Sequence, residues 1–76
     1  MASKPTKAQA RVLEAIREYI AQHGYSPSIR DLMVACDLYS PSTVYVHMNN
    51  LKAKGLISFK KGIARSIRVI DESEKA

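Results

Sequence analysis

The chain is short of cysteine and of long apolar runs, and each shortage excludes a class of protein. Its 76 residues contain one cysteine, Cys36, so an intramolecular disulfide is impossible and a cysteine-based metal site lacks ligands. No apolar run approaches the roughly 20 residues that span a bilayer, and the N-terminus has no signal-like apolar segment. We therefore expect a cytoplasmic, nucleoid-associated protein with no membrane partner.

Enzymatic chemistry also lacks support in the sequence. A chain of 76 residues makes one small domain, with little room for a catalytic cleft beside its own scaffold. No nucleophile–base–carboxylate set, phosphate-cradling glycine loop or paired-carboxylate motif is present. The two histidines, His23 and His47, lie far apart in sequence, which argues against a zinc site. We expect no catalytic residue, no metal, no cofactor and no small-molecule substrate.

Negative charge is missing from one half of the chain. The formal net charge is +5, and no acidic residue lies between Leu38 and Ile70. The same half holds six basic residues: Lys52, Lys54, Lys60, Lys61, Arg65 and Arg68. Many small domains are basic without binding a polyanion, so the net charge alone says little. Its one-sided distribution, however, is typical of a phosphate-binding face.

Three helices are expected, each bounded by residues that start or stop helices. The first, Thr6 to His23, begins with the capping-box pair Thr6 and Gln9 and ends before Gly24. The second runs from about Ile29 to Cys36. Ser28 is its expected N-cap, and Asp31 stands where an acidic side chain can bond back to the N-cap backbone N–H. We interpret Cys36 as a small core residue rather than a reactive thiol.

The third helix has a start, a stop and two different faces. Ser40 precedes Pro41 at the start, and Lys54-Gly55 ends the helix. Three apolar residues recur at helical spacing and are expected in the core: Val44, Met48 and Leu51. His47 beside them is expected to be half-buried. The opposite face is expected to carry uncharged groups that suit base edges: Ser42, Thr43, Tyr45, Val46, Asn49 and Asn50.

A hairpin is expected after the third helix. Residues 56–59 and 66–70 have the composition of strands, and the loop Lys60–Arg65 between them is basic, with Gly62 at its turn. Helix, turn, helix and basic hairpin together predict a mainly α fold with a small β-hairpin, the winged helix-turn-helix. We expect this domain over residues 6–70, with flexible tails at residues 1–5 and 71–76.

Several motifs occur together with agreeing spacing: Gly24-Tyr25-x-Pro27-Ser28-Ile29-Arg30-Asp31-Leu32, then Ser40-Pro41-Ser42-Thr43-Val44, His47, Leu51, Lys54-Gly55-Leu56-Ile57 and Arg65-x-Ile67. In these motifs the chain resembles the N-terminal DNA-binding domain of the LexA family of SOS repressors, over about residues 6–70. The resemblance implies a winged helix-turn-helix that binds operator DNA and represses transcription. It implies base readout from Ser40, Ser42, Thr43, Tyr45 and Val46. It implies a wing near the DNA backbone or minor groove, formed by Lys60, Lys61, Ala64 and Arg65.

Two departures limit what the resemblance implies. Nothing in the 76 residues corresponds to the family's C-terminal self-cleaving peptidase domain, so self-cleavage and that domain's dimer contacts do not carry over. Tyr45 and Val46 are not the residues expected for the SOS operator, so the target sequence is open. Two origins remain open, a stand-alone repressor of a phage or mobile element and a domain cut from a longer repressor.

The resulting hypothesis is a sequence-specific regulator of transcription, a repressor, that binds double-stranded DNA. Candidate base-reading residues are Ser40, Ser42, Thr43, Tyr45, Val46 and Asn49. Candidate backbone and wing contacts are Lys52, Lys54, Lys60, Lys61 and Arg65. A lone domain on one half-site binds weakly, so we expect an inverted-repeat operator with two copies pairing on it. The alternatives are a winged helix that binds another regulator through Tyr45, Val46 and the wing, and a basic domain that coats nucleic acid without sequence preference.

Overall fold

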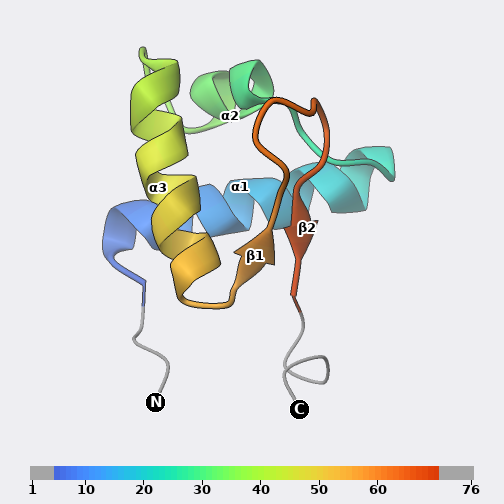
Figure 1. Ribbon diagram of the computed structural model, residues 1–76. Helices are drawn as coiled ribbons and strands as arrows, with labels where there is room; N and C mark the ends of the chain where they lie inside the picture. The colour runs from blue at the N-terminus through green and yellow to red at the C-terminus, as the bar shows by residue number, and fades with distance from the viewer. Residues whose placement is uncertain (1–4, 71–76) are drawn as a thin grey trace.

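Three helices and a two-stranded hairpin make up the fold in the computed structural model, which describes residues 5–70 (Figure 1). The elements are α1 (Lys7–His23), α2 (Ile29–Ala35), α3 (Pro41–Ala53), β1 (Ile57–Ser58) and β2 (Arg68–Val69). The predicted fold class, a mainly helical winged helix-turn-helix, is confirmed. The predicted flexible tails at residues 1–5 and 71–76 fall, apart from Pro5, outside the described residues.

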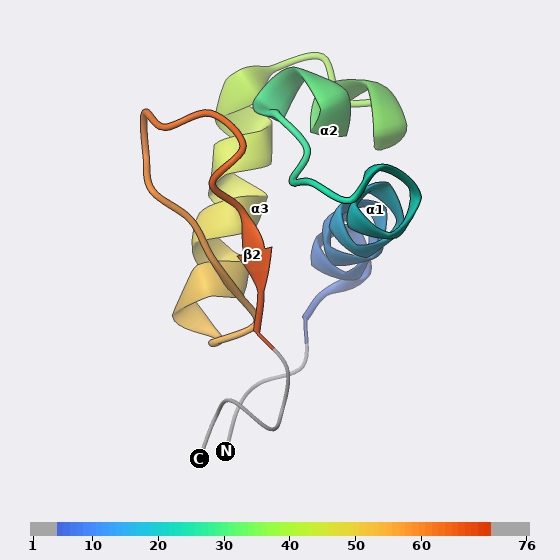
Figure 2. The ribbon, with the colours of Figure 1, turned by 90° about the vertical axis from the view of Figure 1, so that its right-hand side faces the viewer.

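The arrangement of the elements leaves one side of α3 uncovered. Figures 1 and 2 show α3 lying across α1, with α2 beside the start of α3. The β1–β2 hairpin lies along the other part of α3, and its long loop rises toward α2. In the hairpin, β1 and β2 pair antiparallel with Ile57 opposite Val69. We call residues 59–67, the loop of this hairpin, the wing loop.

Both predicted capping boxes are present. At α1, the Gln9 backbone N–H donates to Thr6 Oγ1 over 3.2 Å, and the Thr6 backbone N–H donates to Gln9 Oε1 over 3.2 Å. At α2, the Asp31 N–H donates to Ser28 Oγ over 3.1 Å, and the Ser28 N–H donates to Asp31 Oδ2 over 2.9 Å. Each box satisfies two amide groups that a bare helix start leaves unpaired, so it sets where the helix begins.

The helix ends also follow the sequence closely. Gly24 caps α1 in the left-handed conformation, with φ of 76°, as expected of a glycine stop. The α2 helix ends at Ala35, one residue before the predicted end, and Cys36 is its C-cap. Ser40 is the N-cap of α3 and Pro41 its first residue, but the Ser40 hydroxyl makes no capping hydrogen bond. That hydroxyl is therefore not committed to the helix start.

The strands are shorter than predicted, two residues each instead of four and five. The physical reason is competition for backbone groups in the wing loop. The Lys60 N–H donates to Ser66 Oγ over 2.9 Å, and the Ile67 N–H donates to Ser26 Oγ over 3.1 Å. Both amides thereby leave the β1–β2 ladder. Ile70 continues the pairing on the other side, since its N–H donates to the Leu56 carbonyl over 3.0 Å.

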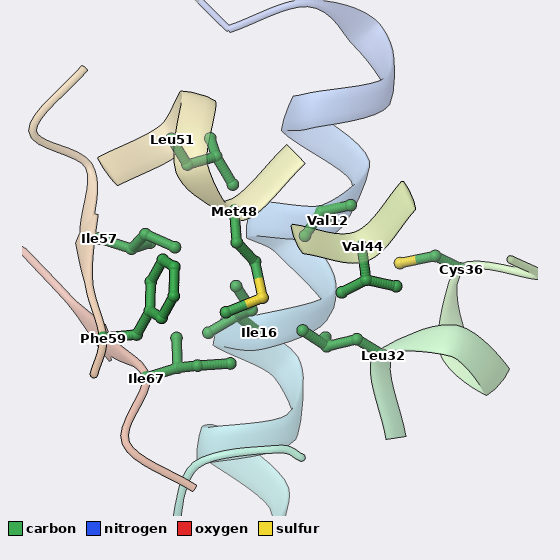
Figure 3. Packing of buried hydrophobic residues seen from close by; sticks show 10 residues of the cluster. All are labelled: Val12, Ile16, Leu32, Cys36, Val44, Met48, Leu51, Ile57, Phe59 and Ile67. Atoms are coloured by element: carbon green, nitrogen blue, oxygen red, sulfur yellow. The ribbon is translucent and has the colours of Figure 1, made fainter. Parts of the chain in front are cut away.

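One hydrophobic core joins all the elements (Figure 3). It contains the following buried residues: Val12, Ile16, Leu32, Cys36, Val44, Met48, Leu51, Ile57, Phe59 and Ile67. The α3 stripe of Val44, Met48 and Leu51 is at most 1% exposed, so its predicted burial is confirmed. Cys36 is buried as predicted, and desolvation raises the pKa of its thiol.

One buried polar residue sits at the edge of this core. The Gln9 side chain is 7% exposed and accepts two hydrogen bonds at Oε1. One comes from the Thr6 N–H and the other, over 2.6 Å, from the Lys54 ammonium at the end of α3. The start of α1 and the end of α3 therefore share one amide group.

Candidate nucleic-acid interface

The outer face of α3 is open to solvent and carries no charge. Four of the predicted base-reading residues are exposed: Ser42, Thr43, Val46 and Asn49. Ser40 is partly exposed. The Val46 side chain is 56% exposed, a large fraction for a valine on a helix that packs against a core. A helix with hydroxyl, amide and methyl groups on its free face can meet the edges of bases in a major groove.

Tyr45 lies elsewhere than predicted. The sequence interpretation placed it opposite the core, but the structure packs it against the core, with its ring 6.5 Å from the ring of Phe59. Successive residues on a helix are 100° apart, so Tyr45 lies on the same side as Met48, one turn later, and faces the hairpin. Val46 and Tyr45 are therefore not a pair on one surface. His47 is half-buried as expected.

A groove separates α3 from the wing loop. Its volume is about 320 Å³, and apolar side chains dominate its lining, among them Tyr45, Met48, Phe59 and Ile63. The N-terminal end of α2 closes one side through Ile29 and its neighbours. The groove thus lies between the exposed face of α3 and the exposed lysines of the wing loop.

The five basic residues predicted to contact the DNA backbone differ in the contacts that hold them. Lys60 and Lys61 are exposed on the wing loop. Lys52 instead donates to the Phe59 carbonyl over 3.2 Å, with its ammonium 5.0 Å from the centre of the Phe59 ring. Lys54 donates to Gln9. Lys52 and Lys54 therefore join α3 to the hairpin and to α1 while adding positive charge beside α3.

Arg65 is held by residues from the far side of the domain. Its Nη1 donates to the Ser26 carbonyl over 2.9 Å and to the Tyr19 hydroxyl over 3.2 Å, and lies 3.3 Å from Asp31 Oδ2. The guanidinium carbon also lies 4.9 Å from the Tyr25 ring centre. Sequence reasoning assigned Arg65 to phosphate and did not find these partners, because they are remote in sequence and no local pattern links them.

Sequence reasoning also missed two exposed apolar residues near the turn between α2 and α3. Tyr39 is 88% exposed, and its hydroxyl donates to Asp37 Oδ1 over 3.0 Å. Val34, on α2, is 79% exposed. Tyr39 directly precedes Ser40, the N-cap of α3. This position in the sequence was sufficient to predict that Tyr39 lies at the start of the helix.

The model of the family described as "LexA DNA binding domain" matches residues 2–66. The chain belongs to this family.

Among its relatives, the LexA repressor of Desulfatibacillum aliphaticivorans is 43% identical over 65 residues, which are 86% of this chain and 32% of that repressor. LexA repressor 1 of Nocardia farcinica is 41% identical over 61 residues, 80% of this chain and 28% of its own. The LexA repressor of Bacillus velezensis is 40% identical over 72 residues, 95% of this chain and 35% of its own. The chain thus spans about a third of the length of these LexA repressors, and the LexA match covers α1, α2, α3 and the wing loop as far as residue 66.

Within residues 5–70, no three His, Cys, Asp or Glu side chains gather in a way that could hold a metal ion. Over the same part of the chain, none of the helices has the length and apolar character needed to cross a membrane.

Proposed function

We propose that the chain is the DNA-binding domain of a transcription repressor that recognises a specific double-stranded operator. The observation that carries the proposal is the uncharged, exposed face of α3 next to a lysine-bearing wing loop, in a chain that belongs to the LexA DNA-binding family. Proteins of this architecture place the second helix of the helix-turn-helix in the major groove, and the wing beside it.

In this proposal, six residues read bases or lie at the reading helix: Ser40, Ser42, Thr43, Tyr45, Val46 and Asn49. The uncommitted hydroxyl of Ser40 can donate to a base or phosphate, because the helix start does not use it. The Val46 methyls suit the C5-methyl of thymine, and Asn49 can pair with adenine. Tyr45 contributes from the wall of the groove, where its hydroxyl can reach DNA that enters between α3 and the wing loop.

The basic residues provide affinity with little sequence information. Lys60 and Lys61 contact phosphates directly from the exposed wing loop, near the backbone or the minor groove. Lys52, Lys54 and Arg65 add positive potential from the positions where they are held. No acidic residue lies between Leu38 and Ile70 in the sequence, but Asp31, 3.3 Å from Arg65, offsets part of the charge of that residue. Two copies on an inverted repeat would double the contacts of one small domain.

Selection from a random duplex pool, read by sequencing, tests the proposal. We expect an enriched motif with inverted symmetry that random duplex of equal length fails to displace. The two direct phosphate contacts, from Lys60 and Lys61, predict that the logarithm of the affinity falls with the logarithm of salt concentration with a slope near −2 for each bound copy. If random duplex competes as well as the selected duplex, the chain is a basic domain that coats nucleic acid without sequence preference. Absence of binding to any duplex at low salt would instead favour the protein-partner alternative.

A further inference from the structure

The wing loop has few backbone ties of its own. Its strands β1 and β2 pair over only two residues each, so the ladder restrains the base of the hairpin and not its loop. Within the loop, the Ser66 hydroxyl closes a local turn with Lys60 and Ile63. These contacts shape the loop internally. Its two ends are held by the burial of Phe59 and Ile67 in the core and by the bond from Lys52 of α3 to the Phe59 carbonyl. The direction of residues 60–66 between these ends depends on contacts with α1, α2 and their connector.

Arg65 supplies most of those contacts. Its guanidinium binds three segments at once: Tyr19 on α1, Ser26 in the connector and Asp31 on α2. It also lies over the rings of Tyr25 and Tyr19, at 4.9 and 5.9 Å from their centres. The planar fork of an arginine suits such a multiple site, and a lysine could not reproduce it.

The anchor for Arg65 is itself well fixed. The Ser26 carbonyl accepts from Arg65, while the Ser26 hydroxyl accepts from the Ile67 N–H two residues further along the loop. Pro27 follows Ser26, restricts it to extended conformations and is fully buried. Asp31 is bound to the backbone of Ser28 in the α2 capping box. The wing loop is therefore tied to a rigid corner of the domain at two adjacent places.

We infer that Arg65 is a positioning residue for DNA recognition and not a phosphate contact. The inference rests on the proposed function. The guanidinium is directed toward the corner between α1 and α2, and its contacts there hold the wing loop so that Lys60 and Lys61 are presented beside α3. The side chain of Arg65 is 44% exposed, so its ion pair adds little to global stability. The Arg65 contacts instead determine the orientation of the wing loop relative to α3.

The test uses Arg65→Lys and Arg65→Gln, with Lys61→Ala as the phosphate-contact reference and Arg17→Gln, an exposed arginine of α1, as the charge-matched control. Affinity for the selected duplex and its salt dependence are measured for each variant. Both Arg65 variants should lose about tenfold in affinity, within the range by which residues that contact no ligand modulate the coupling between sites. Their salt slope should equal that of the unmodified chain, whereas Lys61→Ala should reduce the slope by about 1.

Backbone amide relaxation without DNA gives a second readout that does not depend on DNA binding. In Arg65→Gln, the heteronuclear NOE of residues 60–64 should fall, while the amides of α1 and α3 keep their values. Tyr19→Phe, which removes one hydroxyl and no charge, should give a smaller fall of the same kind, and Arg17→Gln none.

Three outcomes would overturn the inference. One is an unchanged NOE in the wing loop of Arg65→Gln. A second is full affinity in Arg65→Lys, and a third is a slope reduced by about 1 in Arg65→Gln, as for a phosphate contact. A chain that binds no duplex at all would refute the proposed function, while the relaxation measurement would still decide whether Arg65 holds the wing.

Discussion

At the scale of single residues, two exposed valines allow the proposed reading surface to be compared with an ordinary surface. Val46 and Val34 are both largely exposed, but Val46 lies on the free face of α3 and Val34 on α2. In water an exposed valine contributes little to stability, so substitution of either one separates recognition from folding.

Val46→Ala is expected to weaken binding to the selected duplex by on the order of 1 kcal/mol, because it removes methyl groups that contact a thymine methyl. Binding to random duplex should be unchanged. Val34→Ala is the matched control and should bind both duplexes like the unmodified chain. Equal losses of Val46→Ala on selected and random duplex, in fluorescence-anisotropy titrations, would exclude a reading role for this residue.

The single thiol offers a residue-scale test of the core. Cys36 is buried, and desolvation raises the pKa of its thiol, so the reactive thiolate is scarce in the folded chain. A thiol reagent at neutral pH should therefore modify Cys36 slowly in the native protein and rapidly in denaturant. Rapid native modification, at the rate of a free cysteine, would contradict its burial in the core.

At the scale of elements, α2 depends on its start. The helix has seven residues, too few to be stable alone, and its capping box supplies both a helix start and a partner for Arg65. The backbone hydrogen bond from Ser28, joined by the Ser28 hydroxyl and the Arg65 charge, lowers the pKa of the Asp31 carboxyl below its ordinary value. Asp31 therefore favours the folded state in its charged form.

The sign of the pH dependence follows from this lowered pKa. The stabilisation by Asp31 is present above the unfolded value of about 3.9 and disappears as pH falls through the lower folded value. Asp31→Asn should thus be less stable than the unmodified chain at neutral pH, and the difference should shrink below about pH 4. Urea denaturation at several pH values measures it. A difference that stays constant down to the lowest pH would show that the carboxylate charge plays no part.

At the scale of the whole molecule, the exposed lysines and the proposed reading surface lie side by side but on different elements. The free face of α3 is uncharged, and the exposed lysines lie on the wing loop. Lys61→Ala should therefore weaken binding to selected and random duplex by the same factor and reduce the salt slope by about 1. Lys7→Ala, an exposed lysine at the start of α1, is the control. A loss confined to the selected duplex would place Lys61 on a base instead.

The same scale shows which features the sequence could predict. Helix ends, capping boxes and the buried stripe of α3 depend on residues three or four apart, so local patterns located them. The bonds of Lys54 to Gln9 and of Arg65 to Tyr19 join residues 45 and 46 positions apart, and no local pattern contains them. Tyr45 is different, because its spacing of three residues from Met48 already places it on the core side of α3, and the structure covers it there with Phe59 of the hairpin.

The shared amide of Gln9 has a consequence for how the domain opens. Terminal turns of helices normally fray, and their amides exchange with solvent first. Here, fraying of the first turn of α1 also breaks the hydrogen bond from Lys54 to Gln9, which holds the last turn of α3. Opening at one end therefore costs contacts at the other, so the first turn of α1 and the last turn of α3 are expected to exchange their amide protons together, at a rate that amide hydrogen exchange would measure.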